Sequence, residues 1–306
     1  MTNQFSDTHS LISTLIEASV QAYNGFDRRA PTTCQRAKII PPAGYELVDH
    51  WSGIDGLYNH EEQEEIYGLV FRSVTSPYRY IFSFRGTDSL LDTIDDLGTE
   101  HAQFKTFDSA ISVKSDIRVE AGFFNIYTRS EGKKASMQEQ LFDLVRRIQR
   151  SDKPISSLYI TGHSLGAALS TLFAVEAKLN YPDLHIIHVN FASPRVGNAA
   201  FAQWVSTTFQ APDQSLRIVN VHDLIPKMPP EELGYLHTTQ AYFISFYKKE
   251  SLGKLDYLEN HSSLNYKATI AADPYLHEKQ TIYVDETKTT LEVEPMTSEP
   301  KWDVEN

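Results

Sequence analysis

An α/β architecture, in which a mostly parallel sheet carries helices on both faces, is predicted by two observations. The first is the alternation of short β-branched and aromatic runs with longer runs of helical periodicity between residues 136 and 221. The second is the segment 158–168, LYITGHSLGAA, in which a strand-like run meets a helix-forming run across a Gly-His-Ser-Leu-Gly turn. Alternating strands and helices are typical of parallel sheets, because each parallel crossover is usually a helix packed on the sheet.

The length, charge and cysteine content exclude several classes of protein. The 306 residues are enough for one domain with a large core, and the formal charge of −12 argues against a nucleic-acid partner or a polybasic membrane anchor. A single cysteine, Cys34, leaves no partner for an intramolecular disulfide and cannot build a zinc site. We see no apolar run of transmembrane length and no cleavable signal peptide, so the compartment stays open between the cytoplasm and export by a signal-less route.

The first 65 residues predict one helix and few strands. An apolar stripe in residues 9–23 indicates an amphipathic helix that packs across the back of the sheet. Residues 26–65 are rich in proline and acids and are expected to form loops, with one strand at Tyr45 to Val48. Residues 66–74 and 78–86 then predict two adjacent strands joined by a hairpin turn.

Residues 88–97, DSLLDTIDDL, predict a short amphipathic helix. Its apolar face is formed by Leu90, Leu91, Ile94 and Leu97, and its aspartates lie elsewhere. Two interpretations remain open: an ordinary surface helix docked on the core, or a movable cover over an apolar site.

The remaining elements follow the alternating pattern. We expect helices and strands over 136–150, 158–161, 164–180, 185–191, 198–209, 216–221, 240–247 and 261–271, in the order helix, strand, helix, strand, helix, strand, strand, helix. Residues 284–306 are acidic and poor in apolar side chains, and we expect a loosely docked tail. The predicted organisation is one domain over 1–283 followed by this tail.

Ser164 is the candidate nucleophile. It lies at the predicted corner between a strand and a helix, where glycines at 162 and 166 allow the neighbouring backbone to pass closely. Such a corner exposes the serine at the carboxyl edge of the sheet. The amide of Leu165 lies at the N-terminus of the predicted helix, where unpaired N–H groups and the helix dipole stabilise an oxyanion.

A serine hydroxyl needs a base and a carboxylate, and in hydrolases with such a corner these follow in the order acid, then histidine. Asp223 ends the run LRIVNVH and precedes Leu-Ile-Pro, which places it just past a parallel strand. Asp183 and Asp213 enter strands at the wrong edge. Among the later histidines, His237 precedes the strand at 240, His277 heads into the acidic segment, and His261 returns to the correct edge and is the better base.

The segment from Phe82 to Tyr266 resembles the class 3 lipases, the fungal-type triacylglycerol lipase family within the α/β-hydrolase fold. The resemblance rests on several separate motifs: GHSLG at 162–166, FRGT at 84–87, SPRVGN at 193–198, RIVNVHDLIPKMPP at 217–230, GYLH at 234–237, and His261 with Tyr266. The family often carries tryptophan at the position of Thr93, so the sequence departs from the pattern there.

The resemblance implies an α/β-hydrolase fold and a catalytic triad of Ser164, Asp223 and His261. It also implies an oxyanion hole formed by the amides of Thr87 and Leu165, and it assigns residues 88–97 to a lid. The expected activity is hydrolysis of acylglycerol esters at a transient lipid–water interface, with no metal or cofactor. The alternatives are a phospholipase A1, a short-chain carboxylesterase and, from another class, a non-enzymatic scaffold that binds lipid.

Overall fold

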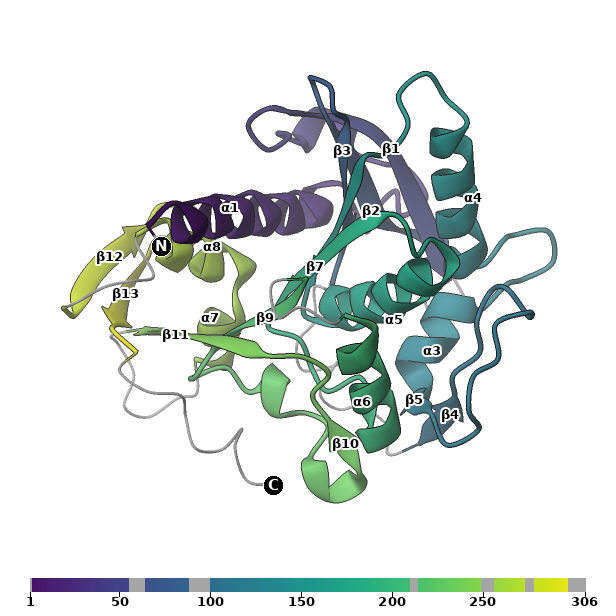
Figure 1. The fold of residues 1–306 in the computed structure, drawn as a ribbon. Coiled ribbons are helices and arrows are strands. Elements are labelled where there is room, and N and C mark those ends of the chain that lie inside the picture. Colours follow the sequence, from purple (N-terminus) through teal and green to yellow (C-terminus); the bar gives the residue numbers. More distant parts are fainter. Residues whose placement is uncertain are drawn as a thin grey trace.

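The computed structural model describes residues 2–54, 64–87, 100–209, 214–248, 256–272 and 278–296. Figure 1 shows strands running through the centre of these residues, with helices on either side. The helices are α1 (Thr2–Asn24), α3 (Ala121–Thr128), α4 (Met137–Gln149), α5 (Leu165–Asn180), α6 (Ala199–Thr208), α7 (Tyr257–His261) and α8 (Ser263–Ala271). The strands are β1 (Tyr45–Ile54), β2 (Glu64–Ser73), β3 (Arg79–Phe84), β4 (His101–Gln103), β5 (Arg118–Glu120), β6 (Ser157–His163), β7 (His185–Phe191), β8 (Gly197–Asn198), β9 (Ser215–Asn220), β10 (Tyr235–Leu236), β11 (Ala241–Lys248), β12 (Gln280–Val284) and β13 (Thr289–Glu294).

The main sheet of the described residues has the strand order β1-β2-β3-β6-β7-β9-β11-β13-β12. Its central strands β3, β6, β7, β9 and β11 are parallel. Antiparallel strands extend it at both ends, β2 and β1 on one side and β13 and β12 on the other. Because the central strands point the same way, the residues that follow them gather at one edge of the sheet, where ligands bind in open α/β folds.

The central strands are buried on both faces. Along β3, Phe82 packs into one apolar cluster while its neighbour Ile81 packs into the cluster on the opposite face. Ile160 and Tyr159 divide in the same way on β6. This alternation follows from the two-residue period of a strand. Because both faces are buried, the sequences of the parallel strands are nearly continuous runs of apolar residues.

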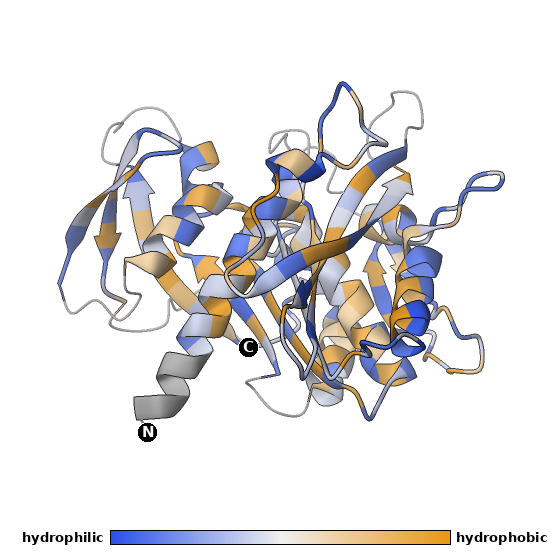
Figure 2. Cartoon of the chain, turned by 90° about the horizontal axis from the view of Figure 1, so that it is seen from above, coloured by the Kyte–Doolittle hydropathy of each residue, from blue (hydrophilic) through white to orange (hydrophobic). Residues whose placement is uncertain are grey.

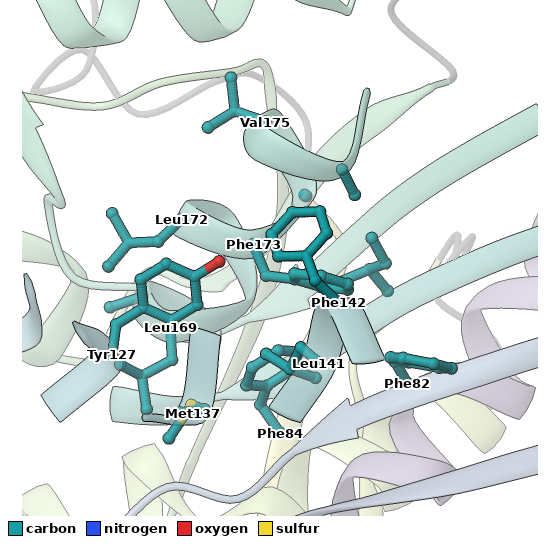
Figure 3. Packing of buried hydrophobic residues seen from close by; sticks show 14 of the residues in the cluster. Phe82, Phe84, Tyr127, Met137, Leu141, Phe142, Leu169, Leu172, Phe173 and Val175 are labelled. Carbon is teal, nitrogen blue, oxygen red and sulfur yellow. The ribbon is translucent and has the colours of Figure 1, made fainter. Parts of the chain in front are cut away.

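Helices α3, α4, α5 and α6 cover one face of the sheet, and α1 and α8 cover the other. On the first face Phe173 of α5 stacks on Phe82, with ring centroids 5.8 Å apart (Figure 3). On the second face Leu15 and Ile16 of α1 pack with Ile270 of α8. Figure 2 shows hydrophobic residues concentrated on the central strands and helices, and largely hydrophilic loops at the periphery. The predicted helix on the back of the sheet is therefore confirmed.

Three local expectations are corrected. The strand expected at Tyr45 to Val48 continues to Ile54 as β1. The helix expected over 261–271 is two helices, with His261 at the end of α7 rather than at the start of a helix. The expected tail is wrong for 289–294, because this segment forms β13, pairs with β11 and buries Leu291 and Val293.

Two further expectations concern parts of the chain that the structure does not describe. The predicted helix over 88–97, with its apolar face, lies outside the described residues, as do residues 297–306 of the expected tail. Within the described ranges, no helix has the length and apolar character needed to cross a membrane.

Candidate active site

Ser164 stands at the junction of β6 and α5, as the sequence predicts, but the expectation of an exposed serine is wrong, because the residue is only 2% exposed. Its backbone φ of 60° and ψ of −128° are unusual for a residue with a side chain, and such strain is typical of functional turns. The two flanking glycines make the turn possible. A Cβ at Gly162 would lie 2.3 Å from the carbonyl oxygen of Gly166, and a Cβ at Gly166 would lie 2.4 Å from the carbonyl oxygen of Phe84.

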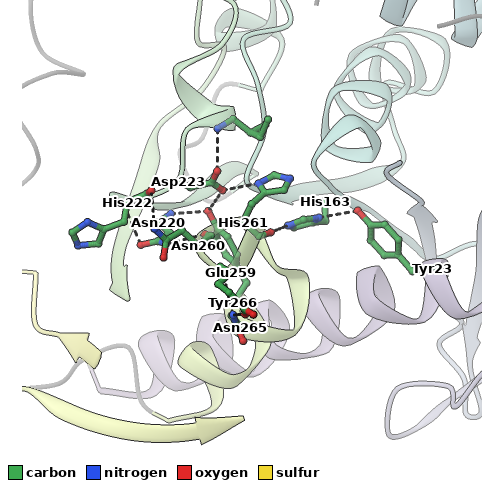
Figure 4. A network of polar contacts seen from close by, with 11 residues as sticks. Tyr23, His163, Asn220, His222, Asp223, Glu259, Asn260, His261, Asn265 and Tyr266 are labelled. Atoms are coloured by element: carbon green, nitrogen blue, oxygen red, sulfur yellow. Dashed lines mark hydrogen bonds and ion pairs between the residues drawn. The ribbon is translucent and has the colours of Figure 1, made fainter. Parts of the chain in front are cut away.

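Asp223 and His261 are in direct contact. Asp223 follows β9, His261 ends α7, and Nδ1 of His261 lies 2.8 Å from Oδ2 of Asp223 (Figure 4). Both side chains are buried. Because the carboxylate accepts, Nδ1 carries the proton and Nε2 of a neutral ring is left as an acceptor. This Nε2 is buried and has no hydrogen-bond partner among the described residues, so it can accept a proton from a nucleophile or a substrate.

Tyr266 completes the surroundings of the carboxylate. Its hydroxyl donates to Oδ2 of Asp223 at 2.9 Å and accepts from the amide of Asn220 at 2.8 Å, while Oδ1 of Asp223 accepts from the amide of Ile225. Burial, and then the negative charge of Asp223, raises the pKa of Tyr266 well above its ordinary value, so the hydroxyl stays a donor. The sequence analysis includes Tyr266 in a motif with His261 but gives it no role, because a tyrosine on a separate helix gives no signal of the carboxylate that it reaches.

Of the other two histidines weighed as the base, only His237 lies among the described residues, and it makes its hydrogen bond elsewhere. Nε2 of His237 lies 2.8 Å from the carbonyl oxygen of Pro226, and the side chain is held within the loop after β9. Burial, followed by the positive charges of Arg217 and Arg195, holds the pKa of His237 well below its ordinary value. His277 lies outside the described residues.

The predicted oxyanion donors lie on two adjacent segments. Leu165 is the first residue of α5, and Thr87 follows β3 in the loop that begins with Arg85. Arg85 anchors this loop, because its Nε donates to the carbonyl of Ile66 and its guanidinium stacks over the ring of Phe26 at 3.8 Å. The assignment of the two amides to an oxyanion hole remains a prediction, as does the apolar cover formed by Leu90, Leu91, Ile94 and Leu97.

The described residues do not bring three or more histidine, cysteine, aspartate or glutamate side chains together in a way that could hold a metal ion. The expectation of metal-free chemistry stays a prediction.

Comparison with known proteins identifies the class. The family model described as lipase (class 3) matches residues 81–233, half of the chain. The chain therefore belongs to the class 3 lipase family.

Individual relatives include both phospholipases and lipases. The chain is 30% identical over 227 residues to the chloroplastic phospholipase A(1) DAD1 of Arabidopsis thaliana, a match that covers 71% of this chain and 48% of the relative. It is 34% identical over 106 residues to the secreted mono- and diacylglycerol lipase A of Penicillium cyclopium, covering 34% of this chain and 33% of the relative. The chain thus spans about half the length, or less, of these curated relatives.

Solved structures agree on the fold. A variant of MDLA from Penicillium cyclopium superposes with a TM-score of 0.57 at 20% identity, covering 83% of this chain and 84% of that chain. A Rhizomucor miehei lipase–propeptide complex superposes with a TM-score of 0.56 at 19% identity, covering 96% of this chain and 71% of that chain. The predicted α/β-hydrolase fold is confirmed.

Proposed function

We propose that this protein is a serine ester hydrolase that cleaves acylglycerol esters, with Ser164 as nucleophile, His261 as base and Asp223 as the acid that orients the base. The observation that carries the proposal is the buried Asp223–His261 pair, in which Nε2 of His261 has no hydrogen-bond partner among the described residues. The His261 ring lies 4.6 Å, centroid to centroid, from that of His163, which directly precedes Ser164 in the strained turn, and this supports Ser164 as the nucleophile. Membership of the class 3 lipase family supports the same chemistry.

The proposed reaction has two halves. Ser164 Oγ attacks the ester carbonyl while Nε2 of His261 takes the hydroxyl proton, and the amides of Thr87 and Leu165 stabilise the oxyanion. His261 then returns its proton to the leaving alcohol, which gives an acyl-enzyme. In the second half, water attacks the acyl group with His261 again acting as base, and the fatty acid is released.

Asp223 serves this cycle by holding His261 in the tautomer that leaves Nε2 unprotonated. It also stabilises the imidazolium that forms when His261 accepts the proton. Tyr266 and the amide of Ile225 bind the two carboxylate oxygens, which supports a fixed direction for the carboxylate. No step requires a cofactor.

The substrate class rests on the family and on the relatives. One relative is a mono- and diacylglycerol lipase, which supports acylglycerols as the first choice. Another is a phospholipase A(1) that matches a longer segment of this chain, and it makes phospholipid hydrolysis the second candidate. The predicted apolar cover over 88–97 suits either lipid.

The test is hydrolysis of a series of p-nitrophenyl esters, emulsified triacylglycerol and phosphatidylcholine by the wild type and by Ser164→Ala. We expect activity on long acyl chains that falls by about a thousandfold or more in the variant. Ser151→Ala, two residues after the end of α4, is the matched control and should keep wild-type activity.

Each outcome has a distinct meaning. Preference for phosphatidylcholine would move the proposal to a phospholipase A1, and preference for short chains to an esterase. Activity that survives Ser164→Ala would refute the proposed nucleophile. A wild-type chain that binds lipid but neither hydrolyses esters nor reacts with a fluorophosphonate would indicate the lipid-binding scaffold.

A further inference from the structure

Tyr23, in the last turn of α1, begins a chain of hydrogen bonds that ends at the candidate base. Its hydroxyl lies 2.9 Å from Nδ1 of His163, and Nε2 of His163 lies 2.8 Å from the backbone carbonyl oxygen of His261 (Figure 4). The rings follow the same path, with centroids 5.9 Å apart for Tyr23 and His163 and 4.6 Å apart for His163 and His261. The N-terminal helix is thereby connected to the acid–base pair.

The direction of these hydrogen bonds follows from the terminal acceptor. A backbone carbonyl can only accept, so Nε2 of His163 carries a proton and donates a hydrogen bond to the carbonyl oxygen of His261. His163 is 2% exposed, and burial, followed by the charge of His261, holds its pKa well below its ordinary value. In the neutral ring Nδ1 is then an acceptor, and the Tyr23 hydroxyl donates to it.

The carbonyl that receives this hydrogen bond is one that needs a partner. His261 is the last residue of α7, a helix of five residues, and the final carbonyls of a helix lack intrahelical donors. The amide of Ser262 bonds back to Glu259, whereas the carbonyl of His261 is reached from outside the helix by His163. His163 therefore fixes the backbone of the residue whose ring must face the nucleophile.

Tyr23 also lies beside Gly86 of the predicted oxyanion loop, close to Ser164. A Cβ placed on Gly86, next to Thr87, would lie 2.2 Å from the Tyr23 hydroxyl and 3.2 Å from Cβ of Ser164. The hydroxyl is thus packed where the predicted oxyanion loop meets the turn of the nucleophile. Residue 23 precedes the segment 81–233 that matches the family model.

We propose that Tyr23 is a positioning residue for ester hydrolysis: its hydroxyl fixes the tautomer of His163, whose Nε2–H holds the backbone of His261 in place. This inference rests on the proposed function, because it assigns His261 the role of base. It adds that the N-terminal helix, besides covering the sheet, contributes to the geometry of the reaction.

The kinetic test compares Tyr23→Phe with Tyr80→Phe. The control also loses a hydrogen bond donated by a tyrosine hydroxyl, since the Tyr80 hydroxyl donates to the carbonyl of Lys153 at the opposite end of β3. We expect Tyr23→Phe to lower kcat about tenfold with KM changed by less than about twofold, because a misplaced base slows the reaction without weakening binding. Tyr80→Phe should lower Tm comparably and leave kcat nearly unchanged.

A double variant separates positioning from general destabilisation. In His163→Gln the tautomer no longer exists, so adding Tyr23→Phe should lower kcat no further. Additive losses of kcat, or a kcat of Tyr23→Phe that matches that of Tyr80→Phe, would overturn the proposal.

A spectroscopic test does not depend on activity. The ring nitrogen shifts of His163, assigned by their absence in His163→Gln, should report a single Nε2–H tautomer in the wild type and a changed tautomer population in Tyr23→Phe. Unchanged shifts would overturn the inference even in an active enzyme. Absence of ester hydrolysis by the wild type would instead defeat the proposed function, and the nitrogen shifts would still decide whether Tyr23 fixes His163.

Discussion

The nucleophile side and the acid–base side of the candidate active site are held in place by different kinds of interaction. Ser164 is positioned by backbone: a central strand, a strained turn and a helix, pressed together where Gly166 passes the carbonyl of Phe84. Asp223 and His261 are 38 residues apart in sequence and meet through side-chain hydrogen bonds, supported by Tyr266.

This difference predicts how each side fails. A turn built from close backbone contacts tolerates no added atom, so damage there should appear first as lost stability. A pair held by hydrogen bonds can lose one partner and keep its fold, so damage there should appear first as lost rate. Three variants test this contrast.

The largest effect is expected from Gly166→Ala. Its Cβ would lie 2.4 Å from the carbonyl oxygen of Phe84, which belongs to the central strand β3 and cannot move aside. We expect a loss of about 3 kcal/mol in the free energy of unfolding, measured by urea denaturation, together with loss of ester hydrolysis. The control is Gly132→Ala, on an exposed turn with φ of 58° and nothing within 4 Å of its Cβ, which should cost only about 1–2 kcal/mol. Equal losses would show that the turn of Ser164 is not unusually tight.

The second effect concerns acid stability on the nucleophile side. His188 is buried on β7 beside Ser170 of α5, and burial lowers its pKa from 6.5 to about 3. The unfolded chain therefore binds a proton that the folded chain excludes, and stability falls as the pH drops from 6.5 toward 3. The expected loss from this residue is about 2 kcal/mol between pH 6.5 and pH 5.

The measurement is urea denaturation of the wild type and His188→Gln at pH 7.5 and pH 5. The variant should lose less stability between the two pH values, although His163 and His237, whose pKa values are also lowered, will keep part of the dependence. His237→Gln, in the loop after β9, provides the matching comparison on the acid–base side. An identical pH dependence in wild type and His188→Gln would show that His188 is protonated without unfolding.

The smallest effect is expected from Tyr266→Phe on the acid–base side. The variant removes one donor to Asp223 and the acceptor for the amide of Asn220, while the His261 contact stays. We expect kcat to fall about tenfold and the free energy of unfolding by about 1–2 kcal/mol. Tyr283→Phe, with a side chain 61% exposed on β12, is the control. A kcat equal to that of the control would mean that Tyr266 does not help to orient the carboxylate.

Predictions from the sequence succeeded where the signal was local and periodic. The strand over 185–191 matches β7, and the helix over 164–180 differs from α5 by one residue. The expected tail failed for 289–294 because Leu291 and Val293 are the two apolar residues of this short segment, and their burial depends on β11, a strand more than forty residues earlier. A short segment that completes the edge of a sheet has no pattern of its own strong enough to reveal it.

In the candidate site, too, local features were predictable from the sequence and contacts between distant segments were not. The sequence by itself determined the turn of Ser164, because glycines, strand and helix are adjacent in the chain and their backbone geometry is a local property. It also narrowed the acid and the base to Asp223 and His261 by their order relative to the strands. Only the tertiary structure decided that Tyr266 reaches Asp223 and that Tyr23 reaches His261 through His163, since these hydrogen bonds join helices on separate parts of the chain and depend on how those helices pack against one sheet.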